Sequence, residues 1–175
     1  MARMTEADAD AYRQPILDAL GRDDPLEVQA SEVAAWRELI DRAGADIRTR
    51  PSEREWSVLE CLGHMTESEL VTSTRYRWVL AENEPPLLGY DQEAWTARFG
   101  PTYHDPAALL ALFSALRDAN VALWQITPPV DRARTGMHAE RGPENFGLLF
   151  RLQAGHGRVH RNQAERALAY VRRNR

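Results

Sequence analysis

Apolar residues recur at intervals of three and four positions in four segments of the chain. In the first segment, within residues 26–48, the recurring positions are Val33, Trp36, Ile40, Ala43 and Ile47. This spacing places the side chains on one face of an α-helix and predicts a helix with a single buried stripe. The segment Thr49-Arg50-Pro51-Ser52 interrupts the pattern, because the residue before a proline disfavours helical backbone.

A second helix is expected from Ser52 to about Glu82. Ser52 and Glu55 have the spacing of a capping box, in which serine and glutamate side chains satisfy free N–H groups at a helix start. The next stretch, 83–103, contains three prolines and two glycines. It is too broken for a helix of three turns and too long for a minimal turn, so we interpret it as a crossover loop.

A third helix is expected to begin at Asp105-Pro106, where an N-cap residue precedes a proline at the first helical position. Pro128-Pro129 ends it, and the polar, glycine-containing stretch 130–144 separates it from a fourth helix between Phe146 and about Arg172. The pattern also allows a short N-terminal helix over residues 9–20. Four long helices with long connections predict an all-α four-helix bundle, which forms a single domain over residues 1–175.

Composition narrows the class of protein further. Apolar residues make up 43% of the chain and charged residues 27%, with a net charge of −4, which is typical of a globular protein and gives no indication of nucleic-acid binding. We find no run of 18 apolar residues, and the polar N-terminus does not resemble a secretory signal, so no membrane span is expected. The single cysteine, Cys61, excludes an internal disulfide and agrees with a cytoplasmic location.

Two histidines of the fourth predicted helix stand out. His156 and His160 are four residues apart and therefore lie on nearly the same face, on a stripe that also contains Leu149. Burial of two neutral imidazoles is unfavourable unless their nitrogens find partners, and one metal ion would bind both rings. The alternative is that the pair is accidental or forms hydrogen bonds with core polar groups such as Gln153 and Gln163.

The second predicted helix offers a third imidazole. His64 shares a helix face with Glu60 and Glu67, and Gly63 beside it would allow another backbone or a ligand to approach closely. A single helical histidine is weak support for a metal site. Three imidazoles from two helices would nevertheless match the ligand set of catalytic zinc, which leaves a coordination position open.

The remaining candidate ligands are weaker. Cys61 lies one turn before His64, so a thiolate ligand is conceivable, although a lone helical cysteine is more often a small core residue. His104 and His138 have no helical partner, and structural or solvent-exposed roles are expected for them. His138 could also line the mouth of a site.

The run from Trp56 to Glu69, WSVLECLGHMTESE, resembles the signature of the DinB/YfiT-like superfamily, in which a tryptophan, a glutamate and a histidine have these spacings. The resemblance extends through YDQEAW at 90–95 and RTGMH at 134–138, ends on HGRVHRNQ at 156–163, and covers about residues 26–172. The chain departs from the family at Glu67, where many relatives carry aspartate. It also departs at Gly155 and Gly157, in a helix that relatives usually keep stiffer.

The resemblance implies a four-helix bundle that binds one divalent ion through His64, His156 and His160, and a tendency to form homodimers. Members are described as metal-dependent hydrolases or as transferases that attach low-molecular-weight thiols to electrophiles. The expected partners are therefore a small-molecule substrate and, for a transferase, a thiol. Nitrogen ligands suit zinc or nickel, with iron, manganese or cobalt as further options.

Two classes of function follow from this ligand set. In an enzyme, the ion would activate a water molecule or a thiol, and Glu67 could accept the proton or orient a ligand histidine. The alternative is a non-catalytic metal-binding or stress-associated bundle. A closed shell of four protein ligands would favour the alternative, whereas a shell of three would favour catalysis.

Overall fold

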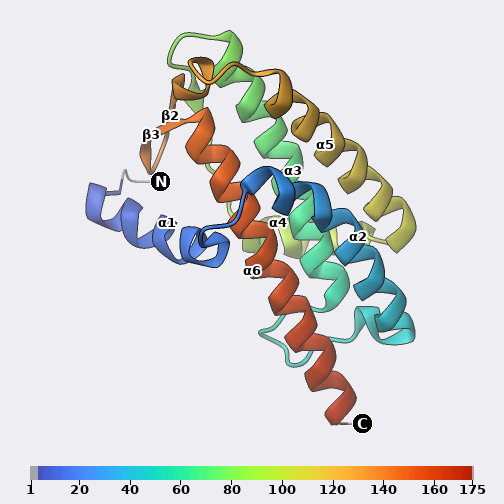
Figure 1. The fold of residues 1–175 in the computed structure, drawn as a ribbon. Helices are drawn as coiled ribbons and strands as arrows, with labels where there is room; N and C mark the ends of the chain where they lie inside the picture. Colours follow the sequence, from blue (N-terminus) through green and yellow to red (C-terminus); the bar gives the residue numbers. More distant parts are fainter. Residues whose placement is uncertain (1–3, 175) are drawn as a thin grey trace.

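Four long helices form the bundle shown in Figure 1, and the computed structural model describes residues 4–174. α3 packs against both α5 and α6, and α2 packs against the same two helices. The predicted all-α four-helix bundle is confirmed. The bundle helices are α2 (Pro25–Ala43), α3 (Val58–Ala81), α5 (Pro106–Ile126) and α6 (Phe146–Arg173).

The bundle interior contains two large apolar clusters with buried polar residues between them, and a small third cluster joins Leu20, Val28 and Ala154. One cluster surrounds Trp36, Met65 and Phe113, and the other surrounds Tyr76 and Phe150. Between these clusters, buried polar side chains project from all three of α3, α5 and α6, among them Glu69, Arg117 and Gln153. The candidate functional residues lie among these side chains, which they reach from different helices.

An additional helix, α1 (Glu6–Leu20), lies across α6 on the outside of the bundle (Figure 1). The two helices touch at Gly155, where a Cβ atom would lie 2.0 Å from the backbone oxygen of Ile16. Only glycine allows the two backbones to come so close. Gly155 therefore serves helix packing, and this explains why a glycine is present within a long helix.

We expect Gly155→Ala to destabilise the protein by roughly 1–3 kcal/mol, because α1 would have to move away from α6. The matched control is Gly157→Ala, where the new Cβ would lie at an ordinary 3.4 Å from the Glu32 carboxyl group. Alanine is the better helix former, so the control should be neutral or stabilising. Urea unfolding measures both changes; an equal gain in stability for the two variants would contradict the close packing of α1.

The start of α3 differs from the prediction. Ser57 and Glu60 form the capping box, with Ser57 Oγ accepting from the Glu60 N–H and the Glu60 carboxylate accepting from the Ser57 N–H. Ser52 and Glu55 do interact, but they form a turn before the helix. Residues 53–55 are exposed, whereas the first turn after Ser57 is buried. Ser52–Glu55 and Ser57–Glu60 have the same capping-box spacing. The helix begins after Ser57 because the turn that follows Ser57 is the one that becomes buried.

The connecting segments contain regular structure that the sequence pattern did not indicate. A three-stranded sheet in the order β1-β2-β3 joins β1 (Pro86–Leu87), β2 (Thr135–His138) and β3 (Gly142–Asn145), with β1 parallel to β2 and β2 antiparallel to β3. The first connection also holds the two-turn helix α4 (Gln92–Phe99). Short 3₁₀ turns occupy Gly44–Arg48, Gly100–Thr102 and Asp131–Ala133. Strands of two to four residues are too short to show a clear alternation of apolar and polar residues.

Among residues 4–174, α5 is the one helix that is long and apolar enough, by length and composition alone, to cross a membrane. Only 22% of the most apolar 18-residue stretch of this helix is buried in the bundle. Its inward face carries Arg117 and Asn120, both fully buried against α3. α5 thus contributes two strongly polar side chains to the interior of the bundle.

Candidate metal centre

The structure brings the three predicted histidines together. His64 projects from α3, and His156 and His160 project from successive turns of α6. One ligand atom from each ring can be chosen so that all three lie within 4.8 Å of one another, and the Nε2 atoms of His64 and His156 are 3.3 Å apart. His64 and His160 are buried and His156 is partly exposed.

This arrangement fits a divalent ion. Two nitrogens bound to a tetrahedral zinc ion at about 2.0–2.1 Å lie roughly 3.3 Å apart, which matches the His64–His156 separation. Burial, and then the neighbouring His160, lower the pKa of His64 to about 3, while burial lowers the pKa of His160 to about 4. The pKa of His156 is also well below its usual value, mainly because of burial. The rings are therefore neutral at pH 7, the form that binds metal.

Hydrogen bonds orient two of the rings. His160 Nδ1 lies 2.9 Å from the Gln163 side-chain oxygen, so Nδ1 carries the proton and Nε2 has a free electron pair. His156 Nδ1 lies 3.4 Å from Ser68 Oγ, which in turn donates to Gln153. Contacts of this kind fix the tautomer of metal-binding histidines. Of the two glutamines considered as alternatives to a metal, Gln163 contacts Nδ1 of His160, whereas Gln153 reaches His156 only through Ser68.

Trp56 covers the cluster from the loop before α3. Its ring stacks on His160 with centroids 5.8 Å apart and lies 5.0 Å from the His64 ring. It is buried and belongs to the apolar cluster of α2 and α3. Trp56 therefore forms an apolar wall beside the imidazoles.

A buried ion pair lies behind the histidines, and the sequence analysis missed it. Glu69 on α3 and Arg117 on α5 are both 0% exposed, with an N–O distance of 2.9 Å. The Glu69 carboxylate also accepts from Asn120 at 2.7 Å and from Gln153 at 2.8 Å. Because Gln153 accepts from Ser68, these contacts extend to His156.

The same network joins all four helices of the bundle. Arg117 donates to Gln29 on α2, and Gln29 donates to the backbone oxygen of Phe150 on α6. The sequence did contain a signal, since Glu69 lies four residues after Met65 and Arg117 lies four residues after Phe113, each on a helix face that an apolar residue marks as inward. Their pairing requires the packing of α3 against α5, which is not a property of either helix alone.

The acidic candidates have different surroundings. Glu67 is partly buried, burial raises its pKa, and it has no hydrogen-bond partner among residues 4–174. Its role as a base stays a prediction. Glu60 caps α3 and forms an ion pair with Arg50, so it fixes the start of the helix that carries His64.

The other candidate ligands lie outside the cluster. Cys61 is in the apolar core, where burial raises the pKa of its thiol to about 12, and His104 is exposed. The close approach expected at Gly63 is made by the Tyr103 ring, which a Cβ atom would meet at 2.0 Å. Within the described residues, the histidine cluster has three ligands and no fourth protein group.

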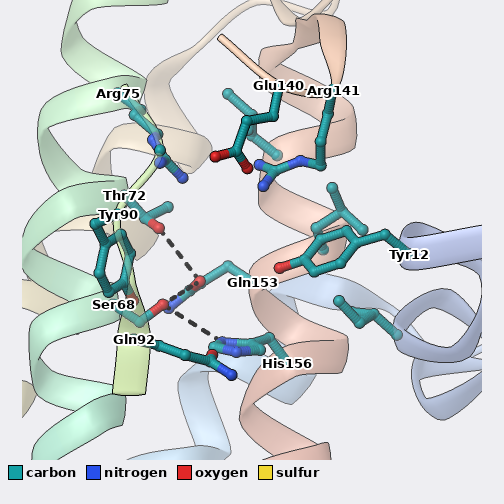
Figure 2. Close-up of a pocket in the computed structure, with 14 residues that line it drawn as sticks. Tyr12, Ser68, Thr72, Arg75, Tyr90, Gln92, Glu140, Arg141, Gln153 and His156 are labelled. Atoms are coloured by element: carbon teal, nitrogen blue, oxygen red, sulfur yellow. Dashed lines mark hydrogen bonds between the residues drawn. The ribbon is translucent and has the colours of Figure 1, made fainter. Parts of the chain in front are cut away.

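A cavity of about 170 Å³ reaches His156 from the side where α1 crosses α6. Figure 2 shows Ser68, Gln153 and His156 at one end of this cavity, with Arg75 and Arg141 at the other. Tyr12 of α1 points into it from the side. A structural or solvent-exposed role was expected for His138, with the mouth of a site as an alternative. It is buried beside Arg75 and accepts hydrogen bonds from the backbone N–H groups of residues 140 and 141, which is a structural role.

These features define a helical bundle protein whose interior holds three converging neutral imidazoles beside a solvent-accessible cavity. The model of the DinB superfamily matches residues 31–164, and the chain belongs to this superfamily. This identification agrees with the resemblance carried by the Trp56–Glu69 motif.

Similar proteins carry related descriptions. An Oceanobacillus iheyensis protein named "Putative metal-dependent hydrolase" is 26% identical over 123 residues, which cover 70% of each chain. A Bacillus mycoides protein of the same name is 26% identical over 105 residues, or 60% of each chain. The structure of YfiT from Bacillus subtilis, described as "a probable metal-dependent hydrolase with an unusual four-helix bundle topology", aligns with a TM-score of 0.75 and 20% identity over 86% of this chain and 85% of YfiT. That likeness shows a shared fold.

Proposed function

We propose that this protein is a metal-dependent hydrolase that acts on a small molecule. The observation that carries the proposal is the cluster of His64, His156 and His160, with neutral rings and no fourth protein ligand among the described residues. The names of the similar proteins point in the same direction. Three protein ligands leave room for water and substrate, as in catalytic zinc sites.

The three histidines would hold the ion, which supplies a Lewis acid that lowers the pKa of water towards neutrality. Gln163 and Ser68 keep two of the rings in the tautomer that presents Nε2. Trp56 excludes bulk water from one side of the cluster. Glu67, three residues after His64 on α3, is proposed as the proton acceptor, and burial raises its pKa towards the range of a general base.

Hydrolysis suits this site better than the two alternatives. Transfer of a low-molecular-weight thiol would require a second organic molecule beside the ion, and the names of the similar proteins point to hydrolysis. A purely structural ion is expected in a closed four-ligand shell, but His156 lines a cavity and is partly exposed. The homodimer and the cytoplasmic location stay predictions from the sequence.

The test is to count metal ions in the purified protein, remove them with a chelator, and restore them one element at a time. We expect about one ion per chain, and hydrolysis of a panel of small esters and amides that stops on removal and returns on reloading. Zinc and nickel come first, followed by iron, manganese and cobalt. Activity that survives complete removal of metal would refute the proposal, as would a protein that takes up none of these ions.

A further inference from the structure

Arg75 on α3 is a buried cation without a carboxylate partner. Its side chain lies at the end of the cavity away from His156, the residue is 7% exposed, and its Nε atom has no hydrogen-bond partner. Its NH2 group donates to the backbone oxygen of Leu88 and lies 3.4 Å from His138 Nε2. Among residues 4–174, no acidic side chain forms an ion pair with it. A buried charge in this state is unfavourable and requires a physical explanation.

The nearby carboxylate of Glu144 is already occupied. It accepts two hydrogen bonds from Arg141, at 2.7 and 3.0 Å, and one from Arg13 at 3.3 Å. Glu144 is thus shared between two arginines, and burial, followed by the neighbouring Arg141, lowers the pKa of Arg75. The Tyr12 ring, 4.9 Å from the Arg141 guanidinium, covers it on the side of α1.

The cavity is positively charged at this end. Arg75 and Arg141 line it, and Glu140 is the acidic residue among the described lining residues. His138 adds no charge at pH 7, because burial and then the neighbouring arginines keep its pKa at about 4. Figure 2 shows both guanidinium groups directed towards the cavity, with the Glu140 carboxylate near them. No ion pair closer than 4.0 Å links Glu140 to Arg75 or Arg141 in this part of the chain.

We propose that this end of the cavity binds the oxyanion of a small substrate, a carboxylate or a phosphate group, through Arg75 and Arg141. Guanidinium groups bind these anions through charge-assisted hydrogen bonds, and the Nε atom of Arg75 is a buried donor without a partner among the described residues. Tyr12 lines the cavity beside Arg141, and Tyr90 lines it beside Ser68.

The anion site and the metal centre share one cavity, since Arg75, Arg141 and His156 all line it. A substrate held at one end by its anionic group would therefore extend towards the histidines. The assignment of this anion to a substrate rests on the proposed function, but binding of the anion itself does not require the ion. Anionic small molecules are accordingly the first compounds to include in a substrate screen.

The experiment is calorimetric titration of the metal-loaded protein with sodium phosphate and with sodium acetate at pH 7 and constant ionic strength. We expect saturable binding that is weakened about tenfold or more in Arg75→Met. Arg98→Met, which removes one exposed charge on α4, is the matched control and should bind as the wild type does. Glu140→Gln should bind the anion several-fold more tightly, because it removes the competing carboxylate.

The titration is repeated with His64→Ala, which lacks one proposed metal ligand. Equal, Arg75-dependent binding in this variant would support the anion site even if no hydrolysis is ever found. Binding of phosphate but not of acetate would identify a phosphate site. Binding of acetate but not of phosphate would identify a carboxylate site. The proposal is overturned if neither anion binds, or if Arg75→Met binds as the wild type does. If Arg75→Met does not fold, unchanged affinity in Glu140→Gln is the overturning result.

Discussion

His160→Ala is expected to weaken binding of divalent metal by two to three orders of magnitude and to abolish metal-dependent turnover. A protein zinc site contributes roughly 10–16 kcal/mol of binding free energy, so the loss of one ligand among three or four costs about 3–4 kcal/mol. Competition with a chromophoric chelator measures this affinity directly. His64→Ala and His156→Ala should have similar effects, because each ring supplies one atom of the same cluster.

Two further variants separate ligands from supporting residues. Gln163→Ala leaves all three rings in place but removes the contact at His160 Nδ1, and a loss of about 10–100-fold in affinity is expected. His104→Ala, at an exposed position, should leave affinity unchanged. Wild-type affinity in His160→Ala, or loss of the ion in His104→Ala, would show that the metal is bound elsewhere.

Glu69→Ala is expected to destabilise the fold by about 3–5 kcal/mol, because it leaves the fully buried Arg117 without its counter-charge. Asn120 and Gln153 would lose their acceptor at the same time. The free energy of unfolding in urea measures the change. Glu67→Ala, two residues away on α3, is the matched control and should cost less than about 1 kcal/mol, since Glu67 has no hydrogen-bond partner among the described residues.

The double variant Glu69→Met/Arg117→Met separates the cost of leaving a buried charge unpaired from the cost of losing side-chain packing. Replacement of both members of a buried ion pair by apolar residues is often close to neutral, so this variant should recover much of the lost stability. It still removes the anchor of Gln153, which contacts Ser68 beside His156. We therefore expect weaker metal binding in a stable protein. A double variant as unstable as Glu69→Ala would show that the ion pair is not the source of the destabilisation.

The sequence by itself determined the bundle helices and two of the three candidate metal ligands. Apolar spacing, prolines and N-cap residues act within one or two helical turns, so they are readable along the chain. For the same reason, the spacing of His156 and His160 was enough to place both rings on one face of a single helix. His64 was joined to them by family resemblance, because no local rule connects residues on two different helices.

Only the tertiary structure decided which side chains meet across helices. The choice of Ser57 over Ser52 as the start of α3 depended on which first turn becomes buried. The pairing of Glu69 with Arg117, the contact of α1 with Gly155 and the cavity between Arg75 and His156 each join segments that are distant in sequence. Such contacts depend on how helices pack, and packing selects among many pairings that the periodicity of each helix allows equally.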